Sequence, residues 1–356
     1  MSDPLQPLRD KIDAIDNQIM ELLNSRAQVV IDVGKAKADS HKSFYVPNRE
    51  QAIYERLKSG NNGPFPVEAI QRVFREIISA SLSLEQPMKV AFLGPQATFT
   101  HVATMQQFGL SAQLVAQKSI PAVFDEVARG RADYGVIPVE NSNEGVVTHT
   151  LDMFMESELK INAEILQEIS HDLLSLSSSV DEIERVYSHP QALAQCRKWL
   201  EENIPDVPLI DVASTAAAAQ MAADDSTAAA IASAMAGAQY GLRQLKSNIA
   251  DNSCNFTRFL VISRKLPEPS GQDKTSIMFC IKDEPGILLR MLEPFGERGI
   301  NLSKIESRPL KKRAWEYIFF LDVEGHIKDE NVSAAVEELG QYCQFVKVLG
   351  SYPKKA

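Results

Sequence analysis

The sequence predicts a multidomain protein: an all-α region, then an α/β region, then an α+β region with a ferredoxin-like βαββαβ order. Apolar residues recur at helical spacing up to about residue 86. Short apolar runs alternate with helical segments up to about residue 264, and a compact strand–helix pattern fills residues 275–351. The 356 residues exceed one ordinary core, which favours two or three domains.

The helical region begins with an unusually long amphipathic pattern. No Gly or Pro interrupts Leu8–Val33, Pro47 marks the start of a second helix, and the Gly-Pro-rich run 60–66 separates it from a third. A first helix of about 30 residues spans about 45 Å, too long to bury its apolar stripe within one small globule. We therefore expect a partner chain to cover that stripe.

The middle region has the texture of an α/β protein. Five apolar runs predict strands at Lys89–Gly94, Tyr134–Glu140, Arg185–His189, Leu209–Ala213 and Phe259–Ser263. An alanine-rich helix is expected after Ser214, and the polar, Pro- and Gly-containing linker Leu266–Lys274 marks a boundary. We expect domains at 1–87, 88–266 and 267–356.

The last region predicts two helices packed on a four-stranded sheet. Its strands are expected at Ser276–Lys282, Ile300–Glu306, Glu316–Val323 and Phe345–Leu349. Pro285 stands where the first turn of one helix would begin, and Asp329 is expected to cap the other. This order is shared by proteins of many functions.

Composition restricts the class of protein. The N-terminus has no basic segment followed by an apolar run, and Asp224 and Asp225 interrupt the alanine-rich stretch, so we expect a soluble, cytoplasmic protein without a membrane span. A net charge of −10 argues against a nucleic-acid surface. The four cysteines are scattered, which predicts buried free thiols. His326 and the other histidines are expected to be surface or capping residues, and neither a metal nor a cofactor is predicted.

Two cations interrupt the apolar stripe of the first helix on its own face. Arg26 and Lys37 are 11 residues apart in the sequence, which points their side chains within about 20° of one another. Cations on a core-facing side need an anionic partner, although an ordinary salt bridge or snorkelling would also account for them.

The helical region resembles the all-helical chorismate mutases. The matching stretches are Leu8–Asp16, Leu22–Arg26, Gly34–Lys37, Arg49–Glu50 and Ser81–Glu85. The resemblance implies that the substrate's carboxylates are held by Arg9, Arg26 and Arg49. It implies that Lys37 and Glu85 contact the ether oxygen, and that Glu50 and Ser81 hold the hydroxyl end.

The implied reaction suits these residue types. A Claisen rearrangement needs a flexible dianion held in its reactive shape and a donor for the charge that develops on the ether oxygen. Arg9 and Lys37 are separated by about 42 Å along one helix, so a shared site requires Arg9 from a second subunit. Many relatives have Gln where this chain has Glu85, and a carboxyl group must be protonated to donate there.

Polar motifs follow or precede expected strands and helices in the middle region. They are Gly94–Thr100, Pro138–Gly145, Ser188–Ala192, Ser214–Thr215 and Asn255–Phe259. Any one of them could be an ordinary cap or turn. Their positions at strand ends and helix starts are those where α/β proteins bind ligands.

Together these motifs resemble the prephenate dehydratases, whose two α/β lobes are similar to type II periplasmic binding proteins. The resemblance implies that Thr257 is the catalytic residue, and we expect Glu140 to act as its acid reservoir. Ala97 stands where relatives often have Gly. Prephenate would be bound, or the cleft held closed, by Asn141, Ser142, Ser188, Gln191, Ser214, Thr215 and Arg258.

The C-terminal region resembles an ACT domain. In dehydratase relatives two segments of this domain form a phenylalanine site between subunits. The matching residues here are Gly286, Ile287, Leu288, Glu306, Ser307 and Arg308. Ile287 replaces a smaller Ala, and a helix-opening turn with a strand end would also account for both segments.

The expected function is therefore a bifunctional, phenylalanine-inhibited enzyme of phenylalanine biosynthesis, acting on chorismate and prephenate. We expect a homodimer, with a tetramer left open. One alternative is a ligand-binding regulator without catalysis, against which Thr257 and Glu140 speak. Another is a dehydratase whose helical part only dimerises, against which Arg9, Arg26 and Lys37 speak.

Overall fold

The computed structural model describes residues 3, 5–40, 47–85, 87–252, 254–281, 284–309 and 317–355, leaving out the side chains of residues 37–40, 47 and 48. The chain divides into two compact units, Met1–Lys89 with Phe108–Gln113 and Val90–Gln107 with Leu114–Ala356. Within the described ranges, no helix combines the length and apolar character needed to cross a bilayer.

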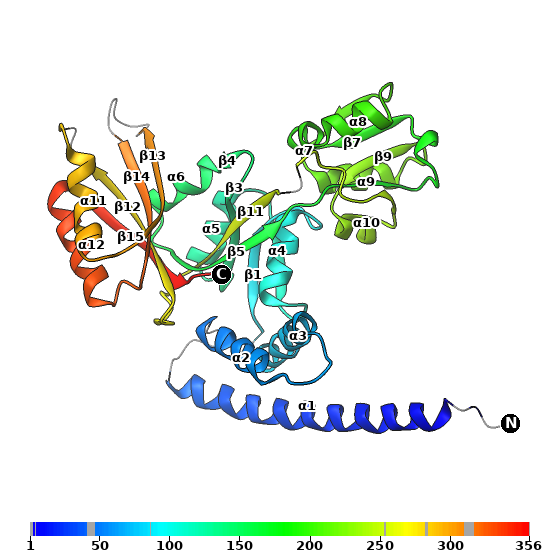
Figure 1. Cartoon of the computed structure of the whole chain (residues 1–356), viewed down its shortest axis with the longest axis horizontal. Helices are drawn as coiled ribbons and strands as arrows, with labels where there is room; N and C mark the ends of the chain where they lie inside the picture. Colours follow the sequence, from blue (N-terminus) through cyan, green and yellow to red (C-terminus); the bar gives the residue numbers. More distant parts are fainter. Residues whose placement is uncertain are drawn as a thin grey trace. The chain divides into compact units, whose positions relative to one another are not determined.

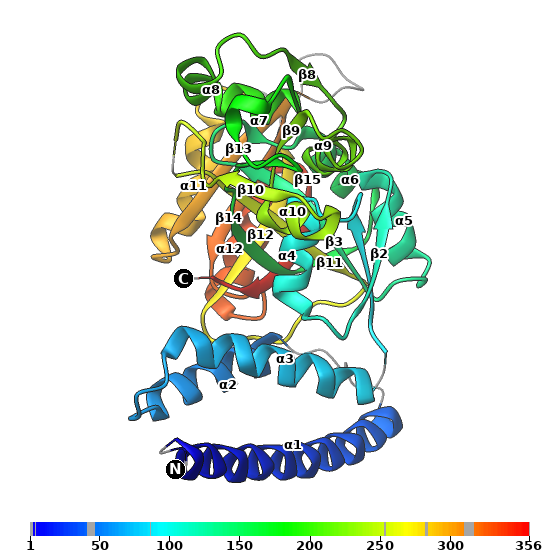
Figure 2. The ribbon, with the colours of Figure 1, turned by 90° about the vertical axis from the view of Figure 1, so that its right-hand side faces the viewer.

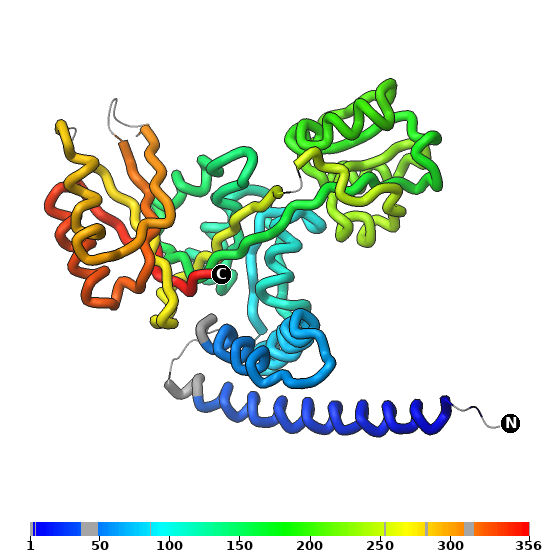
Figure 3. The backbone as a smooth tube through the Cα atoms, in the orientation of Figure 1, coloured from blue at the N-terminus to red at the C-terminus, as the bar shows by residue number. Residues whose placement is uncertain are grey.

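The first unit contains the three expected helices, α1 (Gln6–Ser40), α2 (Pro47–Gly60) and α3 (Val67–Glu85). α1 is one unbroken rod (Figures 1 and 3). Figure 2 shows α3 running along α1, and a Cβ built on Gly34 of α1 would lie 3.3 Å from Glu85 of α3. The apolar stripe of α1 is 49% to 70% exposed at Leu8, Ile12, Ile15, Ile19, Leu22 and Val29.

The second unit begins with a lobe built on a mixed sheet, in the order β2-β1-β3-β11-β5 with β4 paired to β3. The strands are β1 (Lys89–Leu93), β2 (Gln113–Gln117), β3 (Tyr134–Asn141), β4 (Gly145–Val146), β5 (Lys160–Glu168) and β11 (Phe256–Ser263). Its helices are α4 (Phe99–Phe108), α5 (Ile120–Ala128) and α6 (Thr148–Glu156). Phe124 and Phe154 pack edge to face in its core, 5.3 Å between ring centroids.

A second lobe has the strand order β10-β6-β9-β7-β8. The strands are β6 (Asp172–Ser175), β7 (Arg185–Ser188), β8 (Leu209–Asp211), β9 (Ala228–Ala232) and β10 (Arg243–Lys246). A short 3₁₀ helix at Val180–Glu182 and the helices α7 (Pro190–Gln195), α8 (Arg197–Asn203), α9 (Thr215–Ala223) and α10 (Ala234–Tyr240) complete the lobe. Residues of β9 alternate between two apolar clusters, so both faces of this strand are covered.

The C-terminal part has the expected βαββαβ order. It comprises β12 (Asp273–Ile281), α11 (Ile287–Glu297), β13 (Leu302–Pro309), β14 (Tyr317–Glu324), α12 (Glu330–Tyr342) and β15 (Cys343–Pro353), with the sheet order β13-β14-β12-β15. α11 and α12 lie together on one face of this sheet (Figure 1). The other face packs on the first lobe, where Met278 joins a cluster with Ile161 and Leu260.

The contact between this sheet and the first lobe is tightest at Gly350. A Cβ built there would lie 2.3 Å from the carbonyl oxygen of Ile161. Any side chain would therefore push β15 away from β5, which explains glycine at this position.

Several expectations for single residues are wrong. His326 and His171 are buried, at 0% and 3% exposure, whereas His189 caps α7 as expected. Cys254 is exposed, unlike Cys196 and Cys280.

Two helix starts also differ in detail from the expected ones. α11 begins at Ile287, after Gly286 at φ +78°, so Pro285 precedes the helix instead of lying in its first turn. Asp329 occupies the N-cap position of α12, but its carboxylate accepts from the backbone N–H of His326 at 2.7 Å and does not cap the helix.

Candidate active sites

In the helical unit, α1 and α3 bring three of the expected mutase residues together. Arg26 donates from Nη1 to the hydroxyl of Ser81, and it interacts with the charge of Glu85. Partial burial lowers the pKa of Arg26, while the negative charge of Glu85 opposes this shift. A partly buried guanidinium, a hydroxyl and a carboxyl group therefore face one another.

A second polar group lies between α2 and α3. Tyr54 donates a hydrogen bond from its hydroxyl to Glu50 at 2.5 Å. Burial raises the pKa of Tyr54, the Glu50 carboxylate raises it further, and Arg75 counteracts both. Glu50 is thus held in place by its own helix.

Arg9 is not brought to Arg26 within one chain. Arg9 is 59% exposed and pairs with Asp3 at 2.9 Å. It stands 17 residues before Arg26 on the same helix, about 25 Å away. Arg49 is exposed. The side chain of Lys37 lies outside the described residues.

The first lobe places Thr257 beside Asn141. The two residues are directly opposite on β11 and β3, and the Asn141 side-chain nitrogen donates to the Thr257 hydroxyl at 2.8 Å. The Asn141 side-chain oxygen accepts from the backbone N–H groups of Asn143 and Glu144 at 2.9 and 3.1 Å. Since backbone N–H groups only donate, these contacts fix which end of the amide faces Thr257.

Ser142 joins the end of β3 to the start of β11. Its backbone N–H donates to the carbonyl of Phe256 at 2.9 Å, and its hydroxyl accepts from the Phe256 N–H at 3.0 Å. Both contacts hold β3 against the start of β11, so Ser142 supports the backbone around Thr257.

Two of the four candidates in the second lobe, Ser188 and Ser214, use their hydroxyls in structural hydrogen bonds. The buried hydroxyl of Ser188 donates to the carbonyl of Ile231 at 2.7 Å, which ties β7 to β9. Ser214 caps α9 by accepting from Ala217 at 3.0 Å, and Thr215 begins that helix. Gln191 is exposed, beside the His189 cap of α7.

Arg258 and Glu140 lie on the other face of the strand pair from Thr257 and Asn141. Neighbouring residues on a strand alternate in direction, and Arg258 stands directly opposite Glu140. Lys304 of β13 contacts the Glu140 carboxylate at 2.5 Å. The structure therefore does not bring Glu140 to Thr257, and the expected proton reservoir for that hydroxyl has no geometric support.

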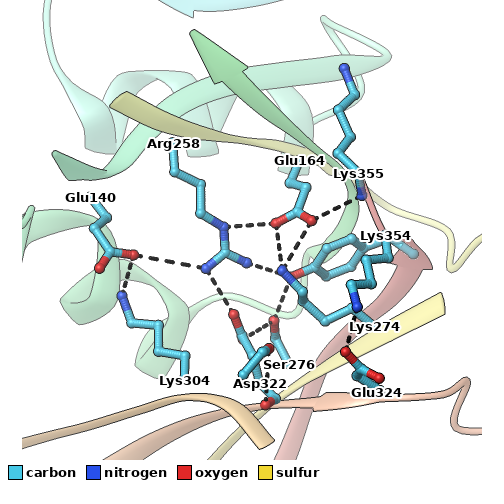
Figure 4. Close-up of polar contacts among 12 residues, drawn as sticks. Glu140, Glu164, Arg258, Lys274, Ser276, Lys304, Asp322, Glu324, Lys354 and Lys355 are labelled. Atoms are coloured by element: carbon cyan, nitrogen blue, oxygen red, sulfur yellow. Dashed lines mark hydrogen bonds and ion pairs between the residues drawn. The ribbon is translucent and has the colours of Figure 1, made fainter. Parts of the chain in front are cut away.

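The guanidinium of Arg258 points into a buried ionic network between the first lobe and the C-terminal sheet (Figure 4). Nε donates to Glu164 at 2.8 Å, Nη1 lies 2.7 Å from Asp322, and Nη2 donates to the Tyr352 hydroxyl at 2.9 Å. These donors are directed away from Thr257, so carboxylate binding by Arg258 is not supported either.

The network is balanced in charge. It contains three carboxylates and three cations: Glu140, Glu164, Asp322, Arg258, Lys274 and Lys304. Burial acts to lower the pKa of Arg258, but the Tyr352 hydroxyl and the negative charges of Asp322 and Glu164 outweigh burial and raise it. Removal of Arg258 would leave the buried Asp322 carboxylate without its cation.

The expected effector segments lie at the start of α11 and along β13. Gly286 adopts a left-handed conformation, and a Cβ built on it would have no atom within 4 Å. Ile287 is buried, and Leu288 is 47% exposed. Arg308 donates to the carbonyl of Thr148 at 2.8 Å, so its guanidinium is engaged with the first lobe. Glu306 is partly buried and Ser307 exposed on β13.

Sequence reasoning missed three polar residues at the junction of the two lobes. Asn255 donates to Gln195 at 2.8 Å, and His171 contacts the same Gln195 oxygen at 2.9 Å. Asn255 stands inside a motif already singled out, but nothing in the sequence joins it to positions 195 and 171. Among the described residues, no group of three or more His, Cys, Asp or Glu side chains could hold a metal ion.

Comparison with known families covers almost the whole chain. The chorismate mutase type II model matches residues 8–86, the prephenate dehydratase model matches residues 90–267, and the ACT domain model matches residues 275–341. The order of the three matches is the order of the three regions described above.

Relatives and solved structures agree with these matches. A bifunctional chorismate mutase/prephenate dehydratase of Aquifex aeolicus is 52% identical over 354 residues, 98% of each chain. That of Escherichia coli strain K12 is 32% identical, covering 99% of this chain and 97% of its own. A prephenate dehydratase from Arthrobacter aurescens, solved in complex with L-Phe, superposes with a TM-score of 0.70 at 37% identity, covering 75% of this chain and 90% of that one. The chain belongs to the family of bifunctional chorismate mutase/prephenate dehydratases.

Proposed function

We propose that the helical unit converts chorismate to prephenate, that Thr257 acts in the conversion of prephenate to phenylpyruvate, and that phenylalanine bound to the ACT domain inhibits the second reaction. The observation that carries the dehydratase assignment is the hydroxyl of Thr257 held by Asn141 at 2.8 Å on the end of β11. The convergence of Arg26, Ser81 and Glu85 supports the mutase assignment.

In the mutase site, the cations Arg26, Lys37 and Arg49 hold the dianion in its reactive shape. No nucleophile is needed, because the rearrangement is unimolecular. Glu85 in its protonated form and Lys37 donate to the ether oxygen, where negative charge develops as the C–O bond breaks. Ser81 and Glu50 hold the substrate's hydroxyl end.

Arg9 enters the mutase site from a second subunit. The exposed apolar stripe of α1 supports this proposal, because a stripe of this length on a single chain needs a partner surface. Mixing two inactive variants, Arg9→Ala and Lys37→Ala, with subunit exchange tests it. A mixed dimer regains one complete site and therefore mutase activity. Activity that stays absent after verified exchange would contradict the shared site.

In the dehydratase site, Thr257 assists departure of the ring hydroxyl. The bond to the ring carboxylate breaks, carbon dioxide leaves, and the electron pair moves through the ring as the C–O bond breaks. The departing hydroxide takes a proton from Thr257, forms water, and Thr257 regains a proton from solvent. Asn141 stabilises the charge that develops on the Thr257 oxygen, because its N–H already points there.

Phenylalanine is proposed to bind at Gly286–Leu288 and at Glu306 and Ser307. A Cβ built on Gly286 would have no atom within 4 Å, so a ligand can approach the backbone there, and the exposed Leu288 offers an apolar contact. Arg308 is assigned to the contact with the first lobe and not to the effector. The solved relative from Arthrobacter aurescens, which is described as a complex with L-Phe, supports this ligand.

One assay tests the whole assignment. The purified chain is incubated with chorismate, and prephenate and phenylpyruvate are followed with and without phenylalanine. We expect both products in turn and loss of phenylpyruvate formation with phenylalanine present. A chain that binds phenylalanine but forms neither product would instead support a non-catalytic regulator.

A further inference from the structure

A continuous chain of hydrogen bonds leads from the dehydratase hydroxyl across the junction of the two lobes. It runs from Thr257 through Asn141, Asn255 and Gln195 to His171, with links of 2.8, 2.9, 2.8 and 2.9 Å. Asn255 and His171 are buried, at 1% and 3% exposure. The members come from both lobes, because Gln195 ends α7 and His171 precedes β6.

Every donor in this chain can be assigned from its neighbours. Two backbone N–H groups fix the Asn141 oxygen as an acceptor, so its nitrogen donates both to Thr257 and to the Asn255 oxygen. The Asn255 nitrogen then donates to the Gln195 oxygen. An amide oxygen cannot donate, so His171 must carry its proton on Nε2.

The state of His171 agrees with this assignment. Its Nδ1 is buried and has no hydrogen-bond partner among the described residues, as expected of the unprotonated nitrogen of a neutral ring. Burial lowers the pKa of His171, with Gln195 acting in the opposite direction, which also favours the neutral form. The histidine thus ends the chain as a donor.

The direction of the chain determines what Thr257 can do. Its oxygen accepts from Asn141, and its own O–H donates to none of the residues that the structure describes. The proton of Thr257 is therefore left for a ligand, which is the arrangement a proton donor to departing hydroxide requires. A reversed Asn141 amide would present its oxygen to Thr257 and draw that proton away.

We propose that Asn255 and His171 are positioning residues of the dehydratase, acting through Gln195 and Asn141 to keep the Thr257 proton directed at the substrate. The inference rests on the proposed role of Thr257. It assigns to the dehydratase two residues that do not touch the substrate, one of them 86 positions before Thr257 in the sequence.

The test compares His171→Leu, which removes the donor, with His171→Gln, whose side-chain nitrogen can donate to Gln195. We expect kcat for phenylpyruvate formation to fall about tenfold in His171→Leu with little change in KM, since an interaction that matters in the transition state is lost. His171→Gln should recover most of the loss. Asn255→Asp, which cannot donate to Gln195, should lower kcat at least as far.

A double variant distinguishes a positioning role of His171 from a general loss of stability. In an Asn255→Asp background, His171→Leu should cause no further loss, because the chain is already interrupted. His326→Gln is the matched control: His326 is equally buried but bonded to Pro267, and we expect kcat to be unchanged. The variants lie in the second unit, so the midpoint of urea unfolding followed for that unit reports whether each variant has folded.

Two results would overturn the inference. One is a wild-type kcat in both His171→Leu and Asn255→Asp. The other is equal loss in His171→Leu and His171→Gln with strictly additive effects in the double variant. A wild-type chain that forms no phenylpyruvate would instead refute the proposed function itself, so the two failures are distinguishable.

Discussion

Thr257 and Arg258 are adjacent on β11 but serve opposite faces of the strand pair. The Thr257 hydroxyl accepts from Asn141 at 2.8 Å, whereas the Arg258 guanidinium lies 2.7 Å from Asp322 of the ACT domain. The same alternation holds on β3, where Asn141 faces Thr257 and the neighbouring Glu140 contacts Lys304 of β13. The β3–β11 strand pair thus has one face toward the hydroxyl of Thr257 and one toward the C-terminal sheet.

Lys304→Met is expected to weaken inhibition by phenylalanine. Lys304 stands two residues before Glu306 on β13 and contacts Glu140 beside Asn141. Its loss therefore removes a link between the proposed effector segment and the strands that carry Asn141 and Thr257. We expect about a tenfold higher phenylalanine concentration for half-inhibition, within the usual range of coupling free energies. Dehydratase rates measured over a range of phenylalanine concentrations give the concentration for half-inhibition of each variant.

The matched control for that change is Lys328→Met, which removes an exposed pair with Glu268 in the same domain. Its inhibition curve should match that of the wild type. An inhibition curve for Lys304→Met that matches the wild type would show that the contact between Lys304 and Glu140 does not contribute to inhibition by phenylalanine.

Arg258→Met is expected to destabilise the second unit. The substitution leaves Asp322 buried without its cation and Glu164 with Lys274 alone, and breaking a buried pair typically costs about 3–5 kcal/mol. The midpoint of urea unfolding, followed for this unit, measures the loss. Arg129→Met removes a cation from the exposed pair with Asp125 and should leave the midpoint in place. Equal midpoints for both variants would show that the network contributes little.

Glu85→Gln is expected to flatten the pH profile of the mutase. Only a protonated carboxyl group can donate to the ether oxygen, so the proposed role makes the wild-type rate depend on whether Glu85 carries a proton when substrate is bound. Glutamine donates at every pH, so its variant should lose that dependence. Initial rates of prephenate formation between pH 5 and pH 9 measure both profiles. Parallel profiles would rule out Glu85 as the donor.

His171 is expected to contribute to acid destabilisation. Because burial lowers its pKa below the ordinary 6.5, the unfolded chain binds the proton first as pH falls. The stabilising contribution is therefore complete above about pH 6.5 and is lost progressively below it. The difference in Tm between pH 7.5 and pH 5.5 should shrink in His171→Gln. His149→Gln, at an exposed site, should retain the wild-type difference in Tm. The same decrease of that difference in both variants would contradict the contribution of His171.

Much of the architecture could be predicted from local sequence. The three helices of the first unit follow from their spacing, Pro47 and the Gly60–Pro66 run. β3 is an apolar run that ends in a polar motif, and β11 is an apolar run that begins with one. β9 was missed because its residues, four alanines and one isoleucine, favour a helix, and only packing on both faces makes them a strand.

The site could be predicted less completely, for a geometric reason. Motifs give positions along the chain but not the face of a strand. Glu140 and Asn141 belong to one motif and point opposite ways, so grouping Glu140 with Thr257 was an error that only the strand register reveals. The hydrogen bonds that lead from Thr257 to Gln195 and His171 join residues of two lobes, and no local sequence pattern predicts them.

The central claim, that one chain carries two reactions with Thr257 acting only in the second, is tested most directly by supplying chorismate to Thr257→Ala. In this variant prephenate should form at the wild-type rate while phenylpyruvate is absent. Thr257→Ser should restore part of the phenylpyruvate formation. Phenylpyruvate formed by Thr257→Ala as fast as by the wild type would contradict the account.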